Sequence, residues 1–178
     1  MVDLVAKTPA EGLLPLQHGD LTLSEAPSEP MTLLAPQRGK DLAAALKAAH
    51  GLSWPKPGRS SAKGGARALW FGLDQVLLTG VEADQALYAE GAVVDQSDAW
   101  CVLHLTGTGA TETLARLVPV DLASPGFKRG HVIRTQINHM SGALTRLGPD
   151  AFELMVFRSM ARTLVEELGQ AMTHVSAR

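Results

Sequence analysis

Residues 69–78 read Leu69-Trp70-Phe71-Gly72-Leu73-Asp74-Gln75-Val76-Leu77-Leu78, and residues 144–154 repeat their plan as Leu144-Thr145-Arg146-Leu147-Gly148-Pro149-Asp150-Ala151-Phe152-Glu153-Leu154. In each stretch an apolar run predicts a strand, a Gly-x-Asp turn reverses the chain, and a second apolar run predicts the antiparallel partner. The apolar strand around Leu33 and the helix after it likewise correspond to the strand around Leu103 and its helix. The sequence therefore predicts an α+β fold, in which two βαββα-like repeats form one or two antiparallel sheets with helices packed on them.

The first 30 residues differ in composition from the rest of the chain. Residues 1–30 hold five acidic residues, one lysine and four prolines, and prolines oppose a helix because they lack a backbone donor. We expect an extended N-terminal arm that either stays mobile or is ordered by lying on another surface, with a short strand at Leu21–Leu23. Residues 31–178 are expected to form a single α+β domain made of the pseudo-repeats 31–91 and 92–178.

The remaining elements follow from periodicity and from glycine and proline positions. Helices are predicted at 41–50, with a stop at Gly51, at 82–90, at 110–118, and after a cap at Ser159. Strands are predicted at 32–35, 68–71, 76–78, 100–105, 131–139, 143–147 and 151–157, and residues 54–65 read as a basic, flexible loop.

Composition excludes several classes of function. The 178 residues carry 16 Lys and Arg against 18 Asp and Glu, for a formal net charge of −2, so the chain has no overall positive field to hold nucleic acid. It has one cysteine, which rules out an internal disulfide and fits a reducing compartment. No apolar run approaches the roughly 18 residues of a membrane helix. We therefore expect a cytoplasmic protein.

The residues that could carry chemistry do not form a recognisable constellation. Gly107-x-Gly109 lacks the other residues of a nucleotide-binding fingerprint. His131 and His139 bracket one strand and would lie about 26 Å apart when it is extended. Cys101 falls on an apolar strand, and we therefore expect its thiol to be buried. The cations of the loop at 54–67 either face solvent or meet an anionic ligand. No catalytic, cofactor-binding or metal-binding residue is expected.

A polar run before a strand is the most distinctive local feature. Asp95, Gln96, Ser97 and Asp98 precede Trp100, and polar clusters beside an aromatic residue commonly mark turns or partner surfaces. Arg134 and Arg158 either pair with the Asp95 and Asp98 carboxylates within the chain or face a partner. The candidates for partner contact or a structural motif are Asp95, Gln96, Ser97, Asp98, Trp100, Arg134, Thr135, His139, Arg158 and Ser159.

Several of these residues also carry a resemblance to a known family. The run from Ala92 to Trp100 continues through Leu103-x-Leu105-x-Gly107, Leu114-x-x-Leu117-Val118-Pro119-Val120-Asp121-Leu122, Phe127, Gly130, Arg134-Thr135, His139-Met140, Phe152-Glu153-Leu154, Val156-Phe157-Arg158-Ser159 and Leu164-x-x-Glu167-Leu168. These motifs resemble the gamma subunit of heterotetrameric sarcosine oxidase, closely over residues 90–175 and more loosely over 40–80. The acidic N-terminal arm contributes nothing to the resemblance.

The resemblance implies a fold like that of the folate-binding domain of glycine-cleavage T-protein, and a non-catalytic role in assembly. It implies a complex that oxidises sarcosine to glycine, passes the one-carbon unit to tetrahydrofolate and reduces oxygen to hydrogen peroxide. The partners would be the alpha, beta and delta subunits, and FAD, FMN, NAD, tetrahydrofolate and zinc would all belong to them. Two alternatives remain open: the equivalent subunit of an N-methylglutamate dehydrogenase complex, and a free-standing folate-binding domain of the T-protein type.

Overall fold

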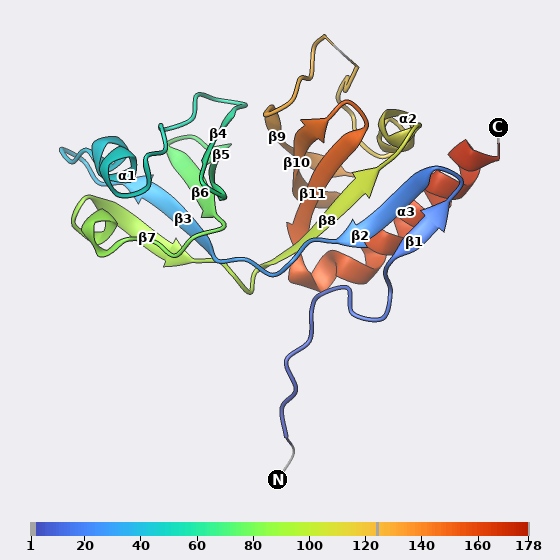
Figure 1. Cartoon of the computed structure of the whole chain (residues 1–178), viewed down its shortest axis with the longest axis horizontal. Helices are drawn as coiled ribbons and strands as arrows, with labels where there is room; N and C mark the ends of the chain where they lie inside the picture. Colours follow the sequence, from blue (N-terminus) through green and yellow to red (C-terminus); the bar gives the residue numbers. More distant parts are fainter. Residues whose placement is uncertain (1–2, 124, 178) are drawn as a thin grey trace.

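The computed structural model describes residues 3–123 and 125–177, which form two antiparallel sheets flanked by short helices (Figure 1). The six-stranded sheet has the order β1 (Leu16–His18), β2 (Leu21–Glu25), β8 (Trp100–Thr106), β11 (Ala151–Phe157), β10 (Met140–Gly148) and β9 (Val132–Ile137). The five-stranded sheet has the order β4 (Ser60–Lys63), β5 (Ala66–Gly72), β6 (Gln75–Thr79), β3 (Met31–Pro36) and β7 (Gly91–Asp95). The predicted α+β class is confirmed.

The helices cover the outer faces of the sheets. They are α1 (Leu42–His50), α2 (Ala110–Leu114) and α3 (Ala161–Ser176), with 3-10 turns η1 (Gln85–Ala89) and η2 (Arg158–Met160). The ends of α1 are those expected from the sequence, because the Asp41 carboxylate accepts a hydrogen bond from the backbone N–H of Ala44 and Gly51 adopts a left-handed φ of 67°. Among the described residues, no helix has the length and apolar character needed to cross a lipid bilayer.

The two halves are built on one plan and exchange a strand. The order β4-β5-β6-β3-β7 corresponds to β9-β10-β11-β8-β2, and both hairpins carry a register shift at the same place, between Trp70 and Gly72 and between Arg146 and Gly148. In the chain β2 precedes β3, yet it pairs with β8. Likewise β7 precedes β8, yet it pairs with β3. Each repeat therefore lends its first strand to the sheet of the other, along connections that run between the two sheets (Figure 1).

This exchange places two strands differently from the predicted ranges. The predicted arm, residues 1–30, contains β1 and β2, which are part of the six-stranded sheet. Leu21 and Leu23 are buried in its core. The alternation of apolar and polar residues that predicted this strand also places both leucines on its buried face. The first repeat thus begins with β2, and the exposed part of the arm is residues 3–8.

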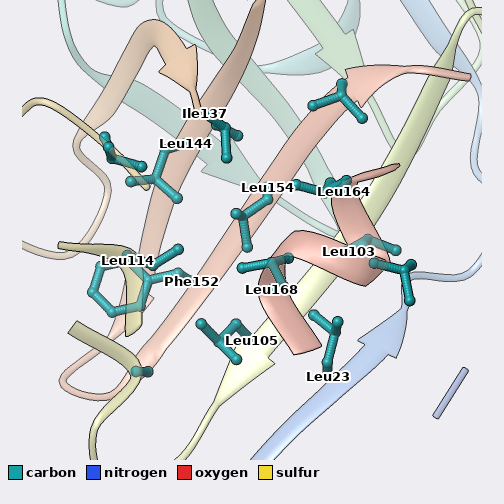
Figure 2. Close-up of a cluster of buried hydrophobic side chains, with 14 of the residues drawn as sticks. Leu23, Leu103, Leu105, Leu114, Ile137, Leu144, Phe152, Leu154, Leu164 and Leu168 are labelled. Carbon is teal, nitrogen blue, oxygen red and sulfur yellow. The ribbon is translucent and has the colours of Figure 1, made fainter. Parts of the chain in front are cut away.

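Three apolar clusters hold the layers together. The largest lies between the six-stranded sheet and helices α2 and α3, and Figure 2 shows Leu103, Leu105, Phe152 and Leu154 of the sheet around Leu164 and Leu168 of α3. A second cluster contains residues of both sheets and joins them. A third packs α1 and η1 on the five-stranded sheet. Because side chains alternate along a strand, β11 presents one face to α3 and the other, with Glu153 and Met155, toward the second sheet.

Four predictions about local elements are wrong. Residues 60–63, predicted as loop, form β4 by pairing with β5. The helices predicted at 82–90 and 110–118 are replaced by the shorter elements η1 and α2. Ser159 does not cap the last helix, since α3 begins at Ala161 after a 3-10 turn and its first turn has no side-chain cap.

Candidate functional site

A buried ion pair connects the two sheets. Glu153 of β11 has only 2% of its side chain exposed, and Arg67 of β5 donates to both of its carboxylate oxygens, at 3.0 and 2.8 Å. His104 lies directly opposite Glu153 in the β8–β11 register, with its Nε2 atom 3.4 Å from Oε2. Two strands of one sheet and one strand of the other thus converge on a single carboxylate.

The environment keeps this carboxylate ionised. Burial alone would raise the pKa of Glu153, but the hydrogen bond from His104 and the charge and hydrogen bonds of Arg67 outweigh it, so the pKa lies below its ordinary value. A bidentate Arg–carboxylate pair also fixes the relative position of the groups that hold it. The ion pair therefore helps to hold the two sheets together.

A cavity of about 150 Å³ adjoins the ion pair. Its polar wall consists of Arg67, His104, Glu153, Glu29 and Thr79, and its apolar lining of Ala26, Pro27, Met31, Val102, Leu147 and Met155. Thr79 is 1% exposed, and its hydroxyl has no hydrogen-bond partner among the described residues. An unpaired buried hydroxyl costs free energy unless water or a ligand meets it. The cavity can therefore hold a small molecule with a polar edge.

A shallower hollow of about 30 Å³ shares five lining residues with this cavity: Ala26, Pro27, Glu29, Met31 and Val102. Trp100 lines the hollow, and its indole N–H is buried without a partner in the part of the chain that the structure describes. The two spaces lie along the first connection between the sheets, residues 26–30. We refer to them together as the crossover groove.

The predicted polar run holds the second connection in place. Asp95 accepts hydrogen bonds from the hydroxyl and the backbone N–H of Ser97, at 2.7 and 2.9 Å, and these bonds hold the pKa of Asp95 below its ordinary value. The Ser97 hydroxyl oxygen accepts from the backbone N–H of Met31, and Gln96 N–H donates to the Met31 carbonyl. Residues 95–97 thus tie the chain before β8 to the start of β3.

The two predicted arginines have different partners. Arg158 lies 3.7 Å from Asp98, whose side chain is fully exposed, and also donates to the backbone carbonyl of Lys7 in the arm. Arg134 makes no ion pair with Asp95; its guanidinium lies 4.1 Å from the centre of the Phe71 ring and 5.4 Å from that of Trp100. An arginine above aromatic rings is stabilised by the negative faces of those rings. The pairing hypothesis thus holds for Arg158 and fails for Arg134.

Trp100 is the centre of an aromatic stack that crosses from one sheet to the other. The rings of Trp100 and Phe71 are nearly perpendicular, with their centres 5.2 Å apart. The rings of Trp100 and Phe157 are stacked, with their centres 4.8 Å apart. Phe157 is 47% exposed, so the stack reaches the surface. Thr135, half-buried on β9, His139, exposed in the turn before β10, and Ser159, exposed in η2, are not part of this group or of the crossover groove.

Of the groups central to this site, His104 and Glu153 are absent from the sequence-based candidates, and Arg67 is named only among the cations of the loop at 54–67, which are expected to face solvent or an anionic ligand. Arg67 and Glu153 are 86 residues apart, and only the packing of the two sheets brings them together. One local signal existed, because Glu153 interrupts the apolar strand Phe152–Phe157. A charged residue on the face of a strand that packs against a second sheet needs a partner.

Cys101 is placed as predicted, inside the core. It is fully buried, and burial, with a contribution from Glu25, raises the pKa of its thiol to about 12. No group of three or more His, Cys, Asp or Glu side chains within residues 3–123 and 125–177 is arranged to hold a metal ion.

We expect Cys101 to resist thiol reagents in the folded chain. The thiolate is the reactive species, so at pH 8 a disulfide reagent should modify native protein only at the rate of unfolding and should modify about one thiol per chain in guanidinium. Absorbance of the released chromophore measures both. Rapid stoichiometric reaction of native protein would contradict the buried position.

Comparison with known proteins gives relatives only among solved structures. No protein-family model matches the chain, and no curated protein sequence matches it. The structure is similar to a chain of the heterotetrameric sarcosine oxidase from Corynebacterium sp. U-96, solved in complex with pyrrole 2-carboxylate, with a TM-score of 0.85 and 27% identity over 97% of both chains.

A second similar structure is the glycine cleavage system aminomethyltransferase T from Bartonella henselae, with a TM-score of 0.58 and 17% identity. The match covers 85% of this chain and 46% of the aminomethyltransferase, so the chain spans less than half of that protein. This likeness concerns the fold. The chain therefore shares its two-sheet architecture with a subunit of a sarcosine oxidase and with part of a T-protein.

Proposed function

We propose that this chain is the non-catalytic gamma subunit of a heterotetrameric sarcosine oxidase, acting in assembly and stabilisation. The observation that carries the proposal is the end-to-end similarity to a chain of such a complex, at a TM-score of 0.85 with 97% of each chain covered. At 27% identity the similarity includes residues as well as fold.

In this proposal the chemistry belongs to the alpha, beta and delta partners, which would hold FAD, FMN, NAD, tetrahydrofolate and zinc. The assembly would convert sarcosine to glycine, transfer the one-carbon unit to tetrahydrofolate and reduce oxygen to hydrogen peroxide. A cytoplasmic location remains a prediction from the sequence.

The contacts of the reactive side chains support a structural role. The Glu153 carboxylate is engaged by Arg67 and His104, and the Cys101 thiol is enclosed in the core. In contrast, the arm exposes Leu4 and Val5 at 97% and 75%. Exposed apolar side chains on an extended segment fit a surface that a partner covers.

Co-purification tests the proposal. The tagged chain, produced at its native level, should elute from gel filtration with flavoprotein chains whose fraction consumes oxygen when sarcosine is added. N-methylglutamate in place of sarcosine distinguishes the related dehydrogenase complex. Elution of the chain alone at micromolar concentration would contradict the proposal, as would turnover of sarcosine by the purified chain without partners.

A second candidate is a free-standing binder of tetrahydrofolate, and the crossover groove favours it. The groove offers the unpaired Thr79 hydroxyl beside an apolar lining, which suits a small molecule with a polar edge. Calorimetric titration of the isolated chain with tetrahydrofolate decides between the two. Binding tighter than about 1 mM, or about −4 kcal/mol, that is lost on Thr79→Val would favour the second candidate.

A further inference from the structure

The charges of this chain are segregated along its sequence. Residues 42–73 and 122–149 contain no aspartate or glutamate, yet they hold nine of the 16 Lys and Arg residues. All 18 acidic residues lie elsewhere. The net charge of −2 therefore hides two basic segments, one in each repeat.

Two matching turns bring these basic segments together. Lys56-Pro57-Gly58-Arg59 precedes β4, and Lys128-Arg129-Gly130-His131 precedes β9. In both turns the backbone N–H of the fourth residue donates to the carbonyl of the first at 3.0 Å, and the glycine has a positive φ, 71° and 78°. A glycine with positive φ at the third position is typical of a type II turn. Each repeat thus carries, at the same place in its fold, a turn of the form Lys-x-Gly followed by a basic residue.

Reciprocal hydrogen bonds join the two turns. Ser60 N–H donates to the Gly130 carbonyl, and Val132 N–H donates to the Gly58 carbonyl, both at 3.0 Å. Arg59 and His131 form an antiparallel bridge, and β4 and β9 lie on facing sides of the two sheets in Figure 1. The backbones of the two turns are therefore held side by side, which brings their cationic residues close together.

The cations of this array are available to a partner. Lys56, Arg59, Lys128 and Arg129 are all exposed, and none of the four makes an ion pair within the described residues. Partial burial and then the charges of Arg59 and Lys128 lower the pKa of His131. Cations of both turns thus lie close enough to His131 to disfavour its protonation.

An apolar groove of about 420 Å³ adjoins the first turn. It is lined by Trp54, Pro55, Lys56, Pro57, Trp70, Gly72, Leu73 and Asp74. Leu73 is 90% exposed, and two tryptophans are the kind of anchor that dominates protein interfaces. A peptide can place an apolar side chain in this groove, whereas the net charge of −2 disfavours a polynucleotide.

We infer that the paired turns and the adjoining groove form a docking surface for an acidic segment of a partner protein, with carboxylates on the four cations and an apolar side chain in the groove. Charge complementarity selects the acidic segment, and the groove selects a polypeptide. This inference deepens the proposed function and rests on it only in assigning the segment to a subunit of the same complex.

Selection from a displayed library of random 12-residue peptides on the immobilised full chain tests the chemistry of the surface. We expect enriched peptides to combine several Asp or Glu with one large apolar residue. The variant Lys56→Glu/Arg59→Glu/Lys128→Glu/Arg129→Glu should weaken the most enriched peptide by at least about tenfold. The matched control Arg38→Glu/Lys47→Glu/Arg116→Glu/Arg162→Glu makes the same charge change on other exposed residues and should weaken it by less than about threefold.

Four further measurements keep the result decisive. Leu73→Ser should weaken binding of the same peptide without any change of charge. If the fourfold variant does not fold, salt tests the charges in its place: 0.5 M salt should weaken binding of the peptide to the unmodified chain. No enrichment, enrichment of neutral or basic peptides, or equal effects of the fourfold variant and its control would overturn the inference. So would tighter binding of a single-stranded oligonucleotide or of a pentaglutamate at the turns.

The purified complex separates this inference from the proposed function. Loss of partners from the fourfold variant, with partners retained by the control, supports both. A complex that tolerates the fourfold variant overturns the docking surface and leaves the proposed function standing. Absence of any complex removes the proposed function, and the peptide selection still decides what the surface binds.

Discussion

Replacing Arg146 by alanine should lower the free energy of unfolding by about 3–5 kcal/mol, the largest effect we expect from a single substitution. Arg146 of β10 is 8% exposed and has no carboxylate partner in the described residues. It donates to four backbone carbonyls, those of Leu122, Phe127, Gly148 and Pro149, and its guanidinium lies 5.0 Å from the centre of the Phe152 ring. Truncation would leave these carbonyls unpaired around a void.

Denaturant titration followed by circular dichroism measures this effect. Arg146→Lys should recover little of the loss, because an ammonium group cannot reproduce the planar fork that reaches four carbonyls. Arg162→Ala, at an exposed position on α3, is the matched control and should stay within about 0.5 kcal/mol of the parent. A small effect of Arg146→Ala would show that the loop at 122–127 is held by other contacts.

Breaking the Arg67–Glu153 pair should have the next largest effect. We expect Glu153→Gln to cost about 2–4 kcal/mol at neutral pH, because Arg67 would lose its charged partner in a largely buried place. The double variant Arg67→Met/Glu153→Leu should cost less than Glu153→Gln alone, since no unpaired charge remains. Glu166→Gln, which removes an exposed carboxylate 4.0 Å from Arg162, should be nearly neutral.

The cost of Glu153→Gln should depend on pH in a defined direction. The pKa of Glu153 is lower in the folded chain than its ordinary value of 4.5, so its ionisation stabilises the fold above that pH. This stabilisation is lost as the pH falls through the folded-state pKa. The difference between parent and Glu153→Gln, measured by denaturant titration from pH 7 to pH 3, should therefore narrow below about pH 4.5. A constant difference would mean that the charge of Glu153 contributes nothing.

Much of the fold follows from local signals. Asp41 and Gly51 mark the ends of α1, and the two Gly-x-Asp turns mark the hairpins, because the required backbone shapes depend on the residues at those positions. Strand β4 could not be predicted in this way. Its residues, Ser60 to Lys63, have no apolar alternation, and only pairing with β5 makes them a strand.

The site depends on contacts that cross the repeats. Local turn chemistry explains Asp95 and Ser97, which bond to each other. Nothing within a few residues of Arg67 or Glu153 indicates that they meet, because the exchange of β2 and β7 sets how the sheets face each other. The predicted break at residue 30 separated β2 from its partner strand and so obscured this arrangement.

The strand exchange has a consequence for how the chain can be divided. A cut near residue 90 would leave β3 in the first fragment without β7 on one side, and β8 in the second fragment without β2 on one side. Neither piece could complete its sheet alone, and mixing the two should restore both. Two identical copies of one repeat that exchanged their first strands would form the same pair of sheets. The architecture therefore corresponds to a strand-swapped dimer within a single polypeptide.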